Sequence, residues 1–359
     1  MDTDRRNLVI WLAFVCLVVY VMITVGGITR LTQSGLSMVD WRPIMGVMPP
    51  MTQDEWHRVF DAYKEYPEYQ KINRGMSLDE FKSIFYWEYG HRVLGRIIGL
   101  IYFIPFMVFL VLGRIPAGFK LKLWMGLLLG GLQGLMGWYM VKSGLVDRPS
   151  VSHYRLAAHL LLALFILGYL FWIILRLAEV QRSGSSETPR GLIHGIALLL
   201  FLQLLFGAFT AGLDAGYFLN TWPLMNGQFL ADAALMMEPL WHNFLENGVM
   251  IQFVHRWLGA LLLGMVFFNL FLAWQRQHLL VPSILLAGIT LVQFLVGIAT
   301  LVMRVPVAMG SFHQAVGALV VLAMVYLVFS AGRPYAAADH SANEDSQRLP
   351  DIQPAETGG

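Results

Sequence analysis

The sequence predicts an all-α integral membrane protein, with eight transmembrane helices arranged as two tandem four-helix bundles related by a pseudo-two-fold axis along the membrane normal. Three observations predict this fold class: an apolar composition, eight apolar stretches of spanning length, and an internal repeat. Of the 359 residues, 57% are hydrophobic and 13% are charged, whereas an average soluble domain has about 25% charged residues. An ordinary soluble enzyme is therefore excluded, and membrane lipid is an expected partner.

Charge and cysteine content narrow the class further. The 25 Lys and Arg against 23 Asp and Glu give a formal net charge of +2, so no nucleic-acid partner is expected. Cys16 is the only cysteine, which excludes an intrachain disulfide and a thiolate metal cluster. Any metal chemistry must therefore use nitrogen or oxygen ligands, or a cofactor.

A helix needs about 20 mainly apolar residues to cross roughly 30 Å of hydrocarbon. Eight stretches meet this length, at 8–28, 92–113, 121–141, 156–177, 191–211, 256–274, 282–303 and 312–332. The first follows Arg5 and Arg6 and could resemble a signal peptide. It ends in Gly26-Gly27-Ile28-Thr29-Arg30, which is no small-x-small cleavage site, so we expect a retained helix.

The distribution of cations predicts the orientation, because short cytoplasmic loops are enriched in Lys and Arg. The N-terminus, the connections after the second, fourth and sixth spans, and the segment after the eighth span all carry cations: Arg5, Arg6, Arg114, Lys120, Lys122, Arg176, Arg182, Arg190, Arg276 and Arg333. Residues 212–254 contain no Lys or Arg and four acids. We therefore expect a multi-pass protein of the bacterial inner (cytoplasmic) membrane, with both termini cytoplasmic and the long connections 30–90 and 212–255 periplasmic.

Three segments are expected from this organisation. Residues 1–180 would form an N-terminal four-helix bundle with a long periplasmic loop, and residues 181–332 a C-terminal four-helix bundle. Residues 333–359 are rich in small, polar and charged residues, so they cannot bury enough apolar surface to fold. They are expected to form a disordered cytoplasmic tail.

The internal repeat matches spans one to four with spans five to eight. Residues 88–95 align with 252–259, 133–137 with 293–297, and 41–45 with 221–225, while the fourth and eighth spans carry a histidine just inside their outer ends. Four spans return a chain to its starting side, so both halves share one orientation. The surviving matches centre on polar residues in apolar helices, which lipid packing alone does not favour.

Five of the ten histidines lie at or near the outer ends of the even-numbered spans: His91, His153, His159, His255 and His313. His91 and His159 are expected to face each other across the first bundle, and His255 and His313 across the second. Imidazoles are costly in hydrocarbon and usually mark function there, so two symmetric pairs favour a shared ligand role. His153 lies six residues before His159, about 240° around a helix, and is expected in the loop.

Two imidazoles without nearby thiolates or paired carboxylates fit the axial positions of haem iron in a helical bundle. Zinc would usually want a third or fourth protein ligand. A di-iron centre would want two Glu-x-x-His motifs, and Glu88 with His91 supplies only one. Arg92 and Arg256 directly follow two of the histidines and are candidate partners for haem propionates, with snorkelling toward the interface as the alternative.

The two halves differ at Glu88, which aligns with Gln252. Glu88 precedes His91 by three residues, so both lie on one helix face, and a carboxylate is expected over one haem face. This difference suits a duplicated haem protein in which one half keeps an electron-transfer haem and the other performs chemistry that needs a charge. The alternative is a carboxylate exposed at the bilayer edge.

Several motifs together resemble the haem A synthase family, closest to its proteobacterial and mitochondrial branch. The resemblance covers nearly the whole chain except the tail. The motifs are Gly26-Gly27-Ile28-Thr29-Arg30-Leu31-Thr32, Ser34-Gly35-Leu36-Ser37, Asp40-Trp41-Arg42-Pro43, Phe81-Lys82-Ser83-Ile84-Phe85-Tyr86-Trp87-Glu88, Glu88-Tyr89-Gly90-His91-Arg92 and Tyr154-Arg155-Leu156-Ala157-Ala158-His159.

The resemblance implies an enzyme that oxidises the C8 methyl group of haem O to the formyl group of haem A, the cofactor of terminal cytochrome oxidases. By position, His91 and His159 would hold the substrate haem O, and His255 and His313 a prosthetic haem b. Glu88 would be the catalytic carboxylate. Haem O synthase and cytochrome oxidase assembly factors are further implied partners, and a homo-oligomer is left open.

Two readings from other classes remain at this point. A dihaem b-type membrane cytochrome that only carries electrons, without haem-modifying activity, would explain the symmetric histidine pairs. A transporter or haem-delivery protein built from parallel repeats is the other, although nothing charged lines the inner halves of the spans to suggest a path.

Overall fold

The computed structural model describes residues 1–39, 48–144 and 151–333, and its regular secondary structure in these ranges is helical. Seven helices of this part of the chain are long and apolar enough to cross a membrane, in agreement with a multi-pass membrane protein. They are α1 (Thr3–Leu31), α4 (Leu78–Val111), α6 (His153–Leu177), α7 (Arg190–Gly212), α9 (Gly248–Arg276), α10 (Leu280–Val302) and α11 (Val307–Ser330).

The remaining predicted span corresponds to α5 (Lys120–Gly144). This helix has spanning length, but it is not among the seven helices that are sufficiently apolar. Several glycines and Gln133 dilute its leucines. The apolar character predicted for seven spans is confirmed, and the eighth membrane crossing stays a prediction.

The long helices α4 and α9 begin before the apolar stretches that predicted them. The second span is predicted from 92, but α4 begins at Leu78, because Ser77 and Glu80 form a capping box there. Likewise α9 begins at Gly248, where the Asn247 side chain accepts a hydrogen bond from the main-chain N–H of Val249. A helix begins where its first N–H groups find acceptors, and the hydrophobic run begins later.

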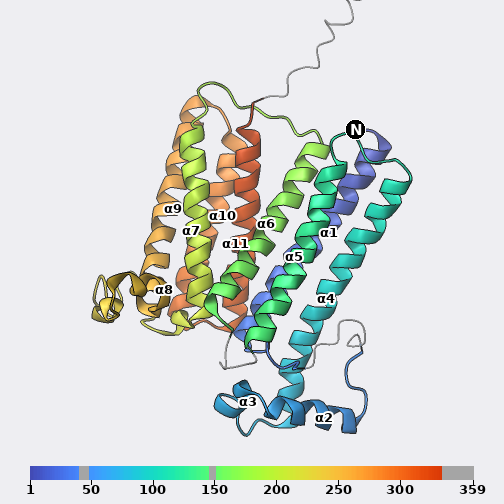
Figure 1. The fold of residues 1–359 in the computed structure, drawn as a ribbon. Coiled ribbons are helices and arrows are strands. Elements are labelled where there is room, and N and C mark those ends of the chain that lie inside the picture. The colour runs from blue at the N-terminus through green and yellow to red at the C-terminus, as the bar shows by residue number, and fades with distance from the viewer. Residues whose placement is uncertain (40–47, 145–150, 334–359) are drawn as a thin grey trace, which may run out of the picture.

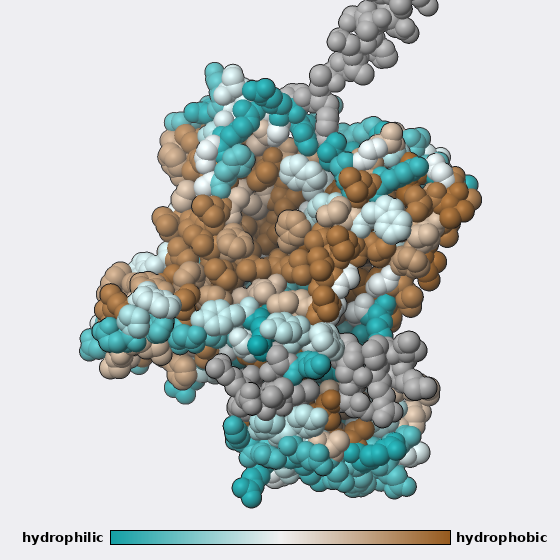
Figure 2. Space-filling model, in the orientation of Figure 1, coloured by the Kyte–Doolittle hydropathy of each residue, from teal (hydrophilic) through white to brown (hydrophobic). Residues whose placement is uncertain are grey.

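The eight long helices form two groups that lie side by side (Figure 1). In the first group, α1, α4, α5 and α6 contact one another in a closed ring, and α7, α9, α10 and α11 do so in the second. Helices α1 and α6 of the first group pack against α11, and α6 also packs against α7. An apolar band crosses both groups between two polar ends (Figure 2).

The connection between α1 and α4 carries two short helices, α2 (Gln53–Lys64) and α3 (Pro67–Lys71), beyond the outer end of the first group (Figure 1). A cluster of buried aromatic side chains joins these helices to the first turns of α4: Trp56, Phe60, Tyr63, Phe81 and Phe85. This outer unit therefore has a small apolar core of its own, and α4 continues into it from the bundle.

The connection between α7 and α9 is built from short helical turns beside the second group. They are η1 (Ala215–Tyr217), η2 (Asp232–Leu235), η3 (Leu240–His242) and α8 (Asn243–Glu246). Asn243 and Asn247 hold this connection together, since both amides donate to main-chain carbonyls within it. The repeat segment at 41–45 and the predicted tail from 334 onward lie outside the described residues.

Candidate functional site

The four histidines singled out in the sequence come from alternate helices of the two rings. His91 lies on α4 and His159 on α6, while His255 lies on α9 and His313 on α11. The His255 and His313 rings are brought together, with centroids 6.5 Å apart and planes at 89°. His91 lies within electrostatic range of His159. The second group of helices therefore brings two imidazoles together, and the first places two within range of each other's charge.

A glycine of the neighbouring helix lies against each of these four rings. A Cβ atom on any of the four glycines would lie 2.8 to 3.2 Å from an imidazole atom, closer than van der Waals contact allows. The pairs are Gly26 with His91, Gly137 with His159, Gly207 with His255, and Gly297 with His313. The histidine rings therefore occupy space that is open because α1, α5, α7 and α10 have glycine at these positions.

Glutamines of the same helices supply hydrogen bonds to three of the histidines. The Gln133 side-chain amide lies 3.2 Å from Nδ1 of His159 and also donates to its main-chain carbonyl, at 3.1 Å. The Gln293 amide lies 3.4 Å from Nε2 of His313. His255 Nδ1 donates to the main-chain carbonyl of Gln203 over 3.2 Å. These contacts restrain the rings from helices α5, α10 and α7.

These residues would fit a haem iron, which one or two protein side chains can hold, better than a bare metal ion. The His255 and His313 ring centroids are 6.5 Å apart, which leaves room for one metal ion between two imidazoles, since metal–imidazole bonds are about 2 Å long. His313 Nδ1 is buried without a hydrogen-bond partner in the described part of the chain. Among the described residues, no group of three or more His, Cys, Asp or Glu could hold a metal ion by themselves.

Glu88 lies in a buried network between α4 and the chain that follows α1. Its Oε2 accepts hydrogen bonds from the Ser37 hydroxyl, at 2.7 Å, and from the Met38 main-chain N–H, at 2.8 Å. Its Oε1 is paired with the Arg92 guanidinium, which also donates to the Met38 carbonyl at 3.0 Å. The predicted alternative of a bilayer-exposed carboxylate is wrong, because only 2% of Glu88 is exposed.

Gln252 and Arg256, the equivalent residues of the other half, also bind the loop that precedes their helix, but Gln252 donates hydrogen bonds where Glu88 accepts them. The Gln252 amide donates to the carbonyls of Ala215 and Phe218, at 2.8 and 2.7 Å. Arg256 donates to Gln252 Oε1 at 3.0 Å and to the Thr221 carbonyl at 2.7 Å. The loop after α1 thus presents donors to a carboxylate, and the loop after α7 presents acceptors to an amide.

His153 is the first residue of α6, so the prediction that it lies in the loop is wrong. It is buried, and its Nε2 lies 2.9 Å from the Leu245 carbonyl. Ser152 precedes it as the N-cap residue without a side-chain capping hydrogen bond, and the helix begins before the apolar run predicted from 156. The ring packs edge-on against Phe209 of α7, and His153 therefore joins the two helix groups.

Sequence reasoning missed two polar residues beside this network. Ser37 carried no signal beyond its place in a motif, since its contact with Glu88 spans a loop. Glu68 is buried in the outer unit, where the Tyr63 hydroxyl donates to it over 3.0 Å. Burial, together with a smaller effect of the charge of Glu88, raises the pKa of Glu68 to about 8. The outer unit thus holds a carboxyl group that ionises reluctantly.

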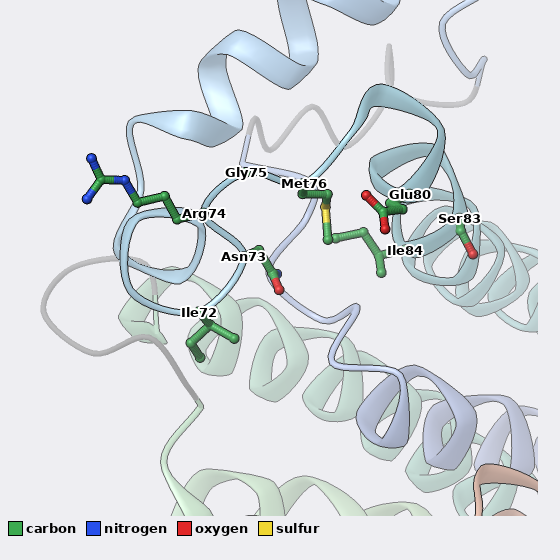
Figure 3. A pocket seen from close by; sticks show the side chains of 8 residues that line it. All are labelled: Ile72, Asn73, Arg74, Gly75, Met76, Glu80, Ser83 and Ile84. Carbon is green, nitrogen blue, oxygen red and sulfur yellow. The ribbon is translucent and has the colours of Figure 1, made fainter.

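An open pocket of about 480 Å³ lies at the outer face, between residues 72–76 and the first two turns of α4 (Figure 3). Glu80 and Ser83 line its α4 side. The four histidines, Glu88 and the two arginines do not line it. The pocket is therefore separate from the candidate site.

The fold and the site define a class: a polytopic helical membrane protein that pairs imidazoles between the helices of each of two groups. The chain belongs to the cytochrome oxidase assembly protein family, whose model matches residues 9–325. The family membership predicted from the motifs is thereby confirmed.

Relatives of known name cover most of the chain. The protein named heme A synthase from Parvibaculum lavamentivorans is 46% identical over 324 residues, which are 89% of this chain and 92% of that protein. The heme A synthase of Nitrosospira multiformis is 45% identical, over 88% of this chain and 90% of its own length. That of Sinorhizobium medicae is 42% identical, over 89% and 88%.

Proposed function

We propose that the protein is a haem A synthase, a membrane oxidoreductase that converts haem O to haem A by oxidising the C8 methyl group to a formyl group. The observation that carries the proposal is the set of four glycine-backed histidines between helices. The identity of 42–46% with proteins named heme A synthase supports it. The product would serve terminal cytochrome oxidase.

The two halves would divide the work. His91 and His159, in residues 1–180, would hold haem O as substrate, and His255 and His313, in residues 181–332, a prosthetic haem b. A bound haem b supplies an iron centre that carries single electrons. The close, perpendicular His255 and His313 rings support a permanent site in the C-terminal half. The carboxylate of Glu88, absent from that half, supports the assignment of chemistry to the N-terminal half.

Glu88 is the proposed catalytic carboxylate. Its side chain is buried, it is paired with Arg92, and it lies one helical turn from His91. A charge held by Ser37, Met38 and Arg92 needs no reorganisation during a reaction, which is how preorganised electrostatics lowers a barrier. Glu88 would stabilise positive charge that develops near the oxidised carbon, or hold a proton released there.

Arg92 and Arg256 are proposed as propionate partners. Both residues directly follow a proposed histidine ligand in the sequence, and both guanidinium groups reach main-chain carbonyls of the loops after α1 and α7, at Met38 and Thr221. Their donors now satisfy main-chain carbonyls of the outer loops. A propionate at the same place would receive charge-assisted hydrogen bonds, which are stronger than those to neutral carbonyls.

The proposed architecture has eight membrane crossings, including α5, in two bundles related by a pseudo-two-fold axis. The two closed rings of helix contacts support the bundles. The predicted orientation has both termini in the cytoplasm and the α2–α3 unit in the periplasm. The absence of Lys and Arg from residues 212–254 supports this orientation.

The proposal is tested by adding haem O to membranes that contain the protein and extracting the haems for chromatography. We expect haem A in membranes with the wild-type protein, and at least a tenfold loss for Glu88→Gln. Glu65→Gln removes the same charge from an exposed position of the outer unit and serves as the matched control. Full conversion by Glu88→Gln would remove Glu88 from catalysis.

A dihaem electron-transfer cytochrome is the second candidate, and the matching glycine–histidine contacts of both halves favour it. Under this reading both haems are permanent and bound with equal affinity. Expression would then leave the haem composition of the membrane unchanged. One haem b together with a substoichiometric haem O or haem A in the purified protein excludes this reading.

A further inference from the structure

Each histidine helix packs antiparallel to a partner helix with a recurring spacing. The partner helix places a glycine against the histidine. One turn away, the residue four positions before this glycine on the partner helix faces the residue four positions after the histidine on the histidine helix. The second contact is seen as a short distance to a Cβ built on the facing glycine: 3.1 Å for Gln203 against Gly259, 3.2 Å for Gln293 against Gly317, and 3.4 Å for Met22 against Gly95. Met22 therefore occupies in α1 the place that glutamine occupies in α7 and α10.

The fourth helix pair follows the same spacing on α5. Gln133 precedes Gly137 by four residues, and its amide contacts His159. Glutamine thus stands one turn before the glycine in three partner helices, and methionine in the fourth. The exception belongs to His91, in the half proposed to bind the substrate haem.

The three glutamines share a second property. Each has a buried side-chain oxygen without a hydrogen-bond partner in the described part of the chain: Gln133, Gln203 and Gln293. His313 Nδ1, next to Gln293, is likewise without a partner there. At Gln133 and Gln293 the amide nitrogen now faces the imidazole, and turning the amide over would present the oxygen instead. A buried amide oxygen without a donor costs free energy, so each of these oxygens needs an N–H group.

A ligating imidazole can provide this group. An imidazole that binds a metal through one nitrogen donates its other N–H to a nearby acceptor, and this hydrogen bond fixes the ring and strengthens the ligand. The glutamine oxygen is such an acceptor once the amide is turned over, whereas a methionine thioether accepts only weakly. At His255 the main-chain carbonyl of Gln203 already accepts from Nδ1, at 3.2 Å.

We propose that Gln133, Gln203 and Gln293 are positioning residues for the imidazoles of His159, His255 and His313. Met22 cannot position His91 in this way, so His91 is the one haem ligand that releases its haem readily. Within the described part of the chain, the His91 ring makes no hydrogen bond with the side chain or the main chain of Met22. This inference rests on the proposed function, because a substrate haem must leave after each turnover and a prosthetic haem must stay.

The proposal gives each half a different retention of haem. Both ligands of the C-terminal pair have a glutamine beside them, because the Gln203 main-chain carbonyl accepts from His255 and the Gln293 side chain lies against His313. We therefore expect this haem to be held permanently. In the N-terminal pair only His159 has one, from Gln133. Loss of such an outer-shell partner typically lowers metal affinity about 10–100-fold, which is the difference expected between the two haem sites.

The test measures haem loss from the purified holoprotein to excess apomyoglobin, followed by absorbance, together with the low-spin electron paramagnetic resonance spectrum of each haem. The wild-type protein should lose haem in a fast and a slow phase. Met22→Gln should slow the fast phase about tenfold or more, and Gln293→Met should accelerate the slow phase by a similar factor. Gln277→Met makes the same side-chain change at an exposed helix end and should alter neither phase.

Two failures can be told apart. If the wild-type protein binds haem through the four histidines but Met22→Gln leaves the fast phase and its spectrum unchanged, the positioning role is wrong and the proposed function stands. If the purified wild-type protein carries no low-spin haem, or if His255→Ala and His313→Ala lose none, the proposed function itself fails. Restoration of the slow phase by Gln293→Asn or Gln293→Glu, relative to Gln293→Met, would support an acceptor role over simple packing.

Discussion

Glu88 and Arg92 form a buried ion pair one turn apart on α4, and both side chains bind Met38 of the loop that follows α1. Gln252 and Arg256 repeat the arrangement on α9 without the negative charge. The Glu-to-Gln difference that the repeat revealed therefore has two consequences. It matches the side chain on each helix to the hydrogen-bond donors or acceptors of the loop that it contacts, and it places a carboxyl group one helical turn from His91 in one half only.

Removal of Arg92 should destabilise the protein strongly. The two side chains are 9% and 3% exposed, and breaking a buried ion pair from one side typically costs about 3–5 kcal/mol, because the remaining charge stays buried. We expect Arg92→Gln to lower the thermal unfolding midpoint in detergent markedly. The Glu88→Gln/Arg92→Gln double variant should be more stable than Arg92→Gln alone; equal midpoints would show that the pair is not coupled.

Ser37 is expected to control how Glu88 is held. Ser37→Ala removes the hydroxyl that donates to Oε2 at 2.7 Å, and an acceptor that loses a buried donor costs about 1–3 kcal/mol. Haem A formation should fall, though less than for Glu88→Gln, since Met38 and Arg92 still hold the carboxylate. Ser83→Ala, exposed on the same end of α4, provides the control. Unchanged turnover in Ser37→Ala would separate the loop contact from catalysis.

The outer unit should loosen in alkaline solution. Burial raises the pKa of the Glu68 carboxyl from 4.5 to about 8, so the folded state prefers the protonated form more than the unfolded state does. The stability from this preference is complete below about pH 4.5 and is lost as the pH rises through about 8. Hydrogen exchange of α2 and α3 should therefore accelerate between these values.

Glu68→Gln separates this titration from a general effect of pH. The amide keeps the shape of the protonated acid and cannot ionise, so its exchange in α2 and α3 should vary little with pH once the intrinsic chemical rate is divided out. Tyr63 and Asn73 form the local hydrogen-bonded chain with Glu68, and burial raises the Tyr63 pKa above its usual value. A pH profile identical to that of the wild-type protein would assign the loosening to another group.

The histidine positions could be predicted from the sequence because a polar residue inside an apolar stretch is visible without any structure. The start of α4 could not, because Ser77 and Glu80 act at a helix end that is no longer apolar. The partners of Glu88 were equally invisible, since Ser37 reaches it only through the path of a loop. The Gln203–Gly207 pair could have been found, because it repeats the spacing of 133–137 and 293–297.

The glycines facing the histidines should not tolerate a methyl group. A Cβ at Gly297 would lie 2.8 Å from the His313 ring, and overpacking of this kind typically costs about 1–3 kcal/mol or displaces the neighbour. Because the ring is a proposed haem ligand, we expect Gly297→Ala to lower the haem content of the purified protein severalfold. Gly288→Ala lies on the same helix with no atom within 4 Å of its Cβ and should retain full haem. Equal haem content in the two variants, measured as the pyridine haemochrome, would show that the close contact places no constraint on the ligand.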